Sequence, residues 1–187
     1  LVIATTNFLI QMNRVLFSCT ATTATSSGIQ SAATVAVRGN ATGIGGFFFF
    51  SRFGVETLSG SGQQVLVGLS ALNAALGGEP SVQNNTIGLI KDSTDTNWFL
   101  LSRNGSAMTK TPTWLAVTAG EVLSLYMFCK SNDTKVTVRL VRENDGSVLL
   151  DDVEIVGTLP VNTTFMYAHA QLRNTGTAIN ALALNRI

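Results

Sequence analysis

Short runs of apolar and β-branched residues, separated by turn-forming residues, recur along almost the whole chain. Clusters such as SGSG, DSTD, SNDT and ENDG lie between these runs, and no regular alternation of helical and strand patterns occurs. The chain therefore predicts an all-β fold of roughly 11 short strands, arranged as an antiparallel sandwich or barrel. The strands are expected at 14–20, 33–39, 47–55, 63–71, 85–92, 97–103, 122–130, 135–143, 147–156, 164–173 and 178–187. A short helical turn is expected only in SALNAALGGEP (70–80).

The clearest local pairing is a hairpin between the runs at 135–143 and 147–156. Asn144, Asp145 and Gly146 join the two arms, and Gly146 can adopt the positive φ that such a turn requires. Apolar and polar residues alternate along the first arm, which is typical of a strand with one face in water.

Four consecutive phenylalanines at 47–50 pose a packing problem. Because alternate side chains of a strand point to opposite faces, Phe47 and Phe49 can enter the core while Phe48 and Phe50 face away from it. An uncovered patch of such rings favours aggregation. We therefore expect a neighbouring subunit or a Thr/Ser-rich arm to cover Phe48 and Phe50, and another segment of the same subunit is the alternative.

The Thr/Ser-rich arm is the low-complexity stretch at 19–43, in which small, β-branched and hydroxyl residues dominate. We expect residues 1–43 to form an N-terminal strand and this arm, packed on the sandwich or on a neighbour. A flexible linker is the alternative for the arm. Residues 44–187 are expected to form the β-sandwich, within a single domain overall.

Charge and hydropathy exclude several classes of protein. The 187 residues contain 12 Lys and Arg against 11 Asp and Glu, a net charge of +1, so the basic surface of a nucleic-acid binder is missing. No apolar run approaches the ~18 residues of a membrane-spanning helix. The opening residues lack the basic start and the cleavage site of a signal peptide. Since the chain begins at Leu1 and stops abruptly at Asn-Arg-Ile, we expect it to be part of a longer protein.

The sequence contains no recognisable catalytic or metal-binding constellation. His169 is the only histidine, and without a G-x-S-x-G motif it is expected on a polar strand face. Cys19 and Cys129 lack zinc-site spacing and are expected to be free and buried, although the sequence leaves their pairing open. Asp92 and Asp95 superficially suit calcium, but an Asx-rich turn without metal is favoured. No catalytic residue, metal or cofactor is predicted.

Aromatic side chains can also form platforms on which sugar rings stack. The candidates are Trp98, Trp114, Tyr126 and Tyr167. A tryptophan in a strand of an all-β domain more often lies in the core, because its ring contributes a large buried area.

Several segments stand in a recognisable order: TTNFLIQMNRVLFS, GGFFFFSRFG, VLVGLS, NTIGLIKDSTDTNWFLLSRNGS and LPVNTTFMYAHAQLRNTGTA. In this order the chain resembles, over almost its whole length, the C-terminal domain of tail-fibre or tail-spike-like proteins of tailed bacteriophages. The resemblance implies a lectin-like β-sandwich, similar to concanavalin-type jelly rolls and commonly presented as a trimer at a fibre tip. It also implies that Phe47, Phe49 and Phe53 line the core, and that this chain departs from the family pattern at Phe48.

The function implied by this resemblance is that of a non-enzymatic virion adhesin, which recognises a glycan or protein on the host surface. The implied partners are two further copies of the chain, other tail proteins and the host receptor, without nucleic acid or membrane insertion. The predicted ligand-binding residues lie in or beside polar turns: Asp95, Asn97, Arg103, Asn104 and Lys110. Phe48 and Phe50 are the predicted oligomer interface.

Two other classes of function stay open at this point. One is a structural decoration or trimer-stabilising module of the virion that binds no receptor. The other is a polysaccharide depolymerase, which requires two carboxylates facing each other across a groove. Asp152 and Glu154 are the acids whose removal tests that alternative, although neighbouring acids on a strand usually form a solvated face.

Overall fold

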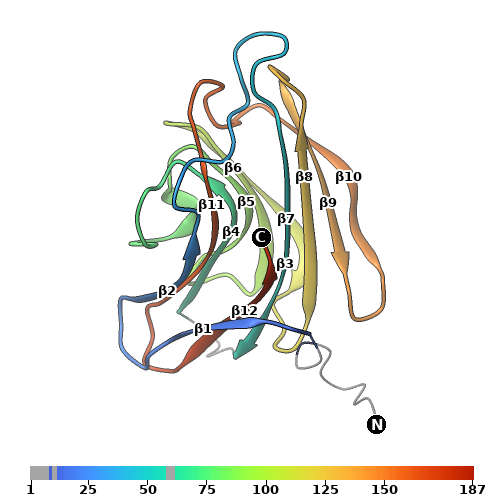
Figure 1. The fold of residues 1–187 in the computed structure, drawn as a ribbon. Helices are drawn as coiled ribbons and strands as arrows, with labels where there is room; N and C mark the ends of the chain where they lie inside the picture. Colours follow the sequence, from blue (N-terminus) through green and yellow to red (C-terminus); the bar gives the residue numbers. More distant parts are fainter. Residues whose placement is uncertain (1–8, 10–11, 58–61) are drawn as a thin grey trace.

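The computed structural model describes Leu9, residues 12–57 and residues 62–187. Two six-stranded antiparallel sheets stack face to face (Figure 1), which confirms the predicted all-β antiparallel sandwich. Sheet A contains, in spatial order, β1 (Val15–Cys19), β12 (Asn180–Arg186), β3 (Phe47–Thr57), β8 (Val122–Cys129), β9 (Lys135–Arg142) and β10 (Val148–Val156). Sheet B contains β2 (Thr25–Gln30), β11 (Tyr167–Asn174), β4 (Gln63–Ser70), β5 (Thr86–Lys91), β6 (Asn97–Arg103) and β7 (Met108–Ala116).

All but one of the predicted strands are present. The prediction at 33–39 is wrong, because Ala36 makes only an isolated bridge to Met166 there. The sequence pattern misses β2 and β7. β2 consists mainly of Thr, Ser and Gly, and β7 contains Pro112, so neither shows a clear apolar alternation. Both are edge strands, and a proline is tolerated at an edge because only one side of the strand needs a complete ladder.

The helical turn expected at 70–80 is also absent. Residues 71–79 form an irregular loop, and a short 3-10 helix, η2 (Pro80–Val82), follows it. The loop covers the outer face of sheet B, where Leu76 is buried with Leu66, Ile90 and Leu101 in a small second core. Burial of Leu76 against sheet B therefore favours the irregular loop at 71–79 over a helical turn. No helix in the described ranges is long and apolar enough to span a membrane.

The main core lies between the two sheets and contains the predicted phenylalanines. Phe49 and Phe53 are buried and Phe47 packs against them, which confirms the alternation expected along β3. Phe53 of sheet A meets Trp98 of sheet B edge to face, with ring centroids 5.7 Å apart. Trp98 is therefore a core residue and not a surface platform.

The predicted hairpin is confirmed by the pairing of β9 with β10, where Gly146 has a φ of +74° in the turn. The N-terminal part of the chain supplies an edge strand to each sheet, β1 to sheet A and β2 to sheet B. The division into residues 1–43 and 44–187 stays a prediction.

The two cysteines are free and buried, as expected. Cys19 ends β1 and Cys129 ends β8. Burial raises the pKa of both thiols, so neither is a reactive thiolate at neutral pH.

Candidate functional site

The five predicted ligand residues do not converge on one surface. Asn97 begins β6 and Arg103 ends it, so the strand separates them by roughly 20 Å. Arg103 Nε donates to Asn84 Oδ1 at 3.2 Å, and Asn104 Oδ1 accepts the backbone N–H of Ala107 at 2.7 Å. Arg103 is therefore bound to the segment before β5 and Asn104 to its own turn, and the set splits into two groups at opposite ends of β6.

Asp95 and Lys110 do meet, in an internal ion network. Lys110 Nζ lies 2.6 Å from Asp95 Oδ2 and 2.7 Å from Asp92 Oδ2. The same ammonium lies over the Phe99 ring, 4.4 Å from its centroid. Burial lowers the pKa of the Lys110 ammonium, but hydrogen bonds to the two carboxylates outweigh burial, and the pKa is raised overall. The ammonium thus stands between the two carboxylates that a calcium ion would need. Within the described residues, no group of three or more His, Cys, Asp and Glu is placed to hold a metal.

The same network anchors the loop that covers sheet B. Asp92 Oδ1 accepts the backbone N–H of Ser81 at 3.1 Å, and Glu79 Oε2 accepts that of Ser93 at 2.8 Å. These carboxylates join residues 79–81 to the turn between β5 and β6. Their role is structural, because their oxygens are occupied by the chain itself.

A different residue at this edge of the sandwich is open to a ligand. Trp114 is 83% exposed and has a φ of +59°, a conformation in which a tryptophan is strained. It lies in a bulge of β7 opposite Trp98. Thr113 Oγ1 donates to the Trp98 carbonyl at 2.7 Å and accepts the Leu115 N–H at 3.3 Å, so the residues on both sides hold the indole outside.

Asn97 lies beside this tryptophan. It pairs with Ala116, two residues beyond Trp114, and alternation along β6 places its side chain on the outer side of sheet B. No hydrogen bond of the Asn97 amide occurs among the described residues. We call Trp114, Asn97 and the exposed Thr96 the Trp114 corner. An exposed indole beside a free amide can stack on an apolar ring face and bind its hydroxyl groups.

The second aromatic surface, here called the aromatic face, lies on the outside of sheet A. Phe48 pairs with Phe128, and Phe50 pairs with Tyr126. Tyr126 stacks on Phe50 with ring centroids 4.8 Å apart and Arg52 lies 5.9 Å from the Phe50 ring, so the same subunit covers Phe50 in part. Phe48 stays 67% exposed and lines a hollow of about 220 Å³. Its assignment to an oligomer interface stays a prediction.

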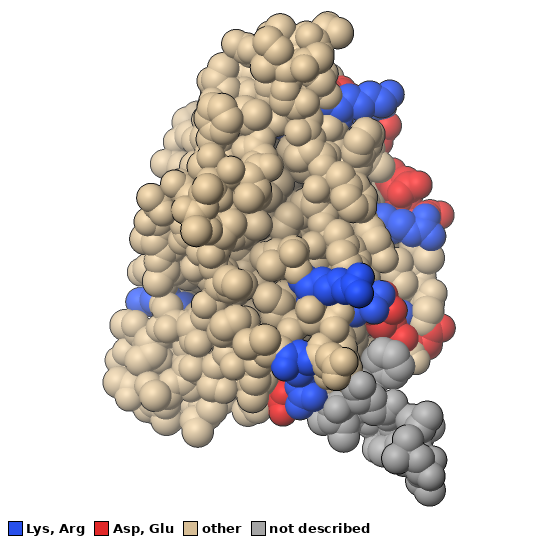
Figure 2. Space-filling model, viewed as in Figure 1, with Lys and Arg blue, Asp and Glu red and all other residues tan. Residues whose placement is uncertain are grey.

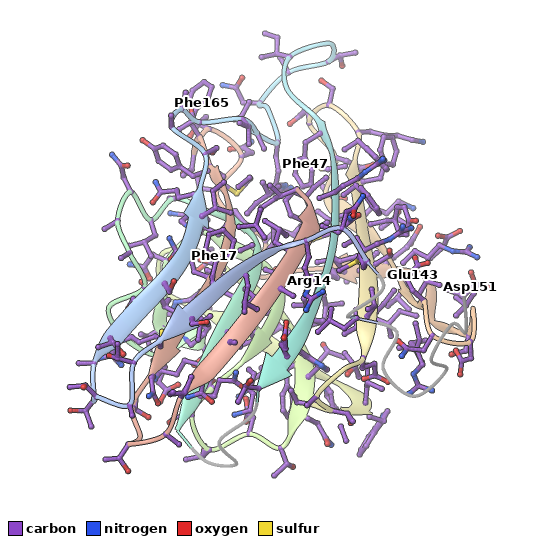
Figure 3. The ribbon with its side chains drawn as sticks, turned by 60° about the horizontal axis from the view of Figure 1, so that its bottom comes forward. Arg14, Phe17, Phe47, Glu143, Asp151 and Phe165 are labelled. Atoms are coloured by element: carbon purple, nitrogen blue, oxygen red, sulfur yellow. The ribbon has the colours of Figure 1, made fainter. Side chains whose placement is uncertain are left out.

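The carboxylates proposed for hydrolysis lie on the exposed edge strand β10. Glu154 pairs with Lys135, and Asp152 occupies a bulge with a φ of +50°. Figure 3 places Asp151, which binds Arg139 at 2.8 Å, at the outer margin of the same region. Charged side chains also gather on this side of the molecule in Figure 2. The region is a solvated face of ion pairs.

His169 lies on a strand, β11, as expected, but its side chain is fully buried, which the sequence pattern does not show. The side chain points to the outside of sheet B, but the loop that follows β4 covers it, and its exposure is 0%. Its ring nitrogens approach the backbone of Ser70 and Leu72 without a hydrogen bond of normal geometry. Burial lowers the pKa of the imidazole, so His169 is neutral in the folded protein at neutral pH.

Comparison with known proteins establishes the fold but no family. No protein-family model and no curated protein sequence matches the chain. Among solved structures, the lectin UEA-II complexed with galactose is 12% identical, with a TM-score of 0.56 over 91% of this chain and 84% of the lectin. A legume lectin-like domain from Entamoeba histolytica is 11% identical, with a TM-score of 0.55 over 98% of this chain and 95% of that domain.

An enzyme has the same fold. An endo-β-1,4-glucuronan lyase from the fungus Trichoderma reesei is 13% identical, with a TM-score of 0.53 over 91% of this chain and 78% of the lyase. At these identities the likeness concerns the fold alone. It confirms the lectin-like, concanavalin-type sandwich and leaves the chemistry to the residues of this chain.

Replacing Lys110 with Met keeps an unbranched apolar side chain but removes the ammonium from Asp92, Asp95 and the Phe99 ring. We expect the free energy of unfolding to fall by about 1–3 kcal/mol, measured by urea denaturation at neutral pH. Because the pKa of Lys110 is raised, its contribution is complete at neutral pH and is lost only in alkaline solution. Lys130→Met, at an exposed lysine, is the control and should change stability by less than about 0.5 kcal/mol. Equal stability of the two variants would contradict a structural role for Lys110.

His169 should make stability depend on pH near neutrality. The unfolded chain binds a proton at this histidine below about pH 6.5, whereas the buried ring resists it. The contribution of His169 to the unfolding free energy should therefore be constant above that pH and fall by up to about 1.4 kcal/mol per pH unit below it. Denaturation curves at several pH values check this, and His169→Leu should flatten the dependence between about pH 5.5 and 6.5. An identical slope in the variant would assign the effect to other groups.

Proposed function

We propose that this chain is a non-enzymatic, glycan-binding attachment domain of a phage tail fibre, displayed on the virion and directed at the host surface. The lectin-like sandwich supports the binding role. The single observation that carries the glycan assignment is the Trp114 corner, where an exposed indole is held outside by a strained bulge. The tail-fibre context rests on the order of sequence segments described above.

The Trp114 corner has the chemistry that a sugar requires. The apolar face of a pyranose packs on the indole, which offers a large flat area at a small cost in side-chain entropy. The Asn97 amide offers one donor group and one acceptor to ring hydroxyls. Thr96 adds a hydroxyl from the exposed turn before β6. A single site with one aromatic ring and two polar side chains binds a sugar with low affinity.

Several copies displayed together raise the strength of attachment. Linked sites increase avidity without any new contact at each site. We propose a homotrimer in which the aromatic face packs against a neighbouring copy, since this would cover the exposed Phe48 ring. Burial of such a ring contributes about 1.5–3 kcal/mol for each copy. The trimer would then present three Trp114 corners to one cell surface.

A depolymerase is the competing function, because a glucuronan lyase has the same fold. The acids named for it lie in ion pairs or at an exposed bulge of β10, which supports binding over cleavage. The same experiment that tests binding can test cleavage.

Trp114→Ala should weaken glycan binding strongly. We expect the wild type to bind members of an array of bacterial surface polysaccharides, and the variant to bind them at least about tenfold more weakly. Phe165→Ala removes another exposed aromatic ring and should bind like the wild type. Equal binding by Trp114→Ala, or no binding by the wild type, would contradict the proposal. Release of oligosaccharides from the same polysaccharides would establish a depolymerase instead.

Phe48→Ser combined with Phe50→Ser should weaken the trimer. Light scattering should give three times the chain mass for the wild type and a lower mass for the double variant, because the interface loses its apolar area. Val82→Ser, at an exposed valine near sheet B, serves as the control and should keep the mass of the wild type. A double variant that stays trimeric with unchanged stability would place the interface elsewhere.

A further inference from the structure

The charged side chains that the structure describes beside the Trp114 corner are already paired with one another. Asp95 directly precedes the corner in the chain, and its Oδ2 lies 2.6 Å from Lys110 Nζ. The same ammonium lies 2.7 Å from Asp92 Oδ2 and 4.4 Å from the centroid of the Phe99 ring. Because two carboxylates compensate its charge, Lys110 offers little to a carboxylate of a ligand.

The ion network around Lys110 carries a net negative charge. Glu79 and Lys91 join Asp92, Asp95 and Lys110 in it. With both lysines protonated, three carboxylates face two ammonium groups, so the net charge is −1. Salt screens charges over about 8 Å at physiological ionic strength, and a ligand bound beside the network therefore feels this charge. The network repels an anionic group that approaches the corner.

The two stretches of chain that form the corner are uncharged. Residues 96–102 and 111–120 contain no Lys, Arg, Asp or Glu. Ala116 pairs with Asn97, so the two stretches lie side by side at the corner. Exposed side chains next to the indole are small or hydroxylated, as at Ala116 and Thr118. These stretches therefore offer a ligand an aromatic ring, an amide and hydroxyl groups, and they supply no cation.

The indole stands in the open and not inside a pocket. Trp114 is 83% exposed, so the side chains around it do not enclose its ring. A pocket that selects one small ligand usually buries most of the surface of that ligand. An open ring can only stack on one face of a sugar residue, and it leaves both ends of that residue free to continue into a chain. This shape suits a residue within a polysaccharide better than a terminal residue.

Given the glycan-binding function proposed for this corner, on which the assignment rests, we infer that its ligand is an internal residue of a neutral polysaccharide chain. The indole of Trp114 stacks on the apolar face of that residue, and the Asn97 amide and the Thr96 hydroxyl bind its hydroxyl groups. A uronic acid at the same place brings a carboxylate beside a network of the same sign. It loses water there without gaining a cation, so acidic chains are selected against.

The first test uses an array of bacterial surface polysaccharides. Each member that owes its acidity to carboxyl groups is present twice, in its native form and after chemical reduction of those groups to alcohols, which keeps the linkages. We expect the wild-type chain to bind neutral members, and to bind a reduced form at least about threefold more strongly than its native partner wherever either form binds.

Two different failures of this test can be told apart. Equal or stronger binding of the native acidic forms would overturn the preference for neutral chains while leaving glycan binding in place. Absence of binding to every member, native and reduced, would contradict the glycan-binding function itself.

Soluble fragments of each bound polysaccharide test whether an internal residue is recognised. Fragments of about eight sugar residues should compete with the immobilised chain at least about tenfold better than the free monosaccharides. Trimming the chain ends with an exoglycosidase should leave binding unchanged. Competition by a monosaccharide as strong as that by the longer fragments, or loss of binding after trimming, overturns the assignment to an internal residue.

A variant with an added cation locates the source of the selectivity. Ala116→Lys places an ammonium opposite Asn97, and should strengthen binding of the native acidic members at least about threefold. This gain should disappear in about 0.5 M salt, which screens the added charge. Val156→Lys adds the same charge at an exposed valine of β10 and should bind like the wild type. No gain in Ala116→Lys, or an equal gain in Val156→Lys, overturns the electrostatic basis of the inference.

Discussion

The edge-to-face contact between Phe53 and Trp98 ties sheet A to sheet B at the centre of the sandwich. Because Trp98 points inward, alternation along β6 turns Asn97 and Phe99 outward. β7 bulges opposite Trp98, and Thr113 bonds to the Trp98 carbonyl within that bulge. The indole of Trp114 is displayed outside as a result. The exposed tryptophan thus depends on the position of the buried one.

Much of the fold follows from the sequence because most strands carry their own signal. Alternating apolar residues and Asx- or Gly-rich turns mark the hairpin of β9 and β10 without any tertiary information. Strands are mispredicted where strand formation depends on a neighbouring strand and not on the apolar pattern of the segment itself. β2 is a strand because β11 supplies a ladder for its Thr and Ser residues. The 33–39 segment has the composition of a strand but only one bridge, at Ala36.

The candidate site was less accessible to prediction, since it depends on which side chains are already occupied. The sequence marks Asp95 and Lys110 as polar and near turns, but only the fold brings the Lys110 ammonium between two carboxylates. His169 lies among polar residues in the sequence, but in the structure a loop covers it. Burial of Leu76 against sheet B holds that loop in place. Trp114 was one of the four aromatic candidates that the sequence offered, but only the burial of Thr113 and Leu115 on either side of it shows that its indole lies outside.

The two buried thiols have a consequence for where such a domain can be made. Cys19 and Cys129 contribute to the molecule as small apolar groups, and no covalent cross-link between them holds the sheets together. Maturation of the domain therefore requires neither an oxidant nor a disulfide isomerase. The same folded form is accessible in the glutathione-rich interior of a cell and in the oxidising medium outside it.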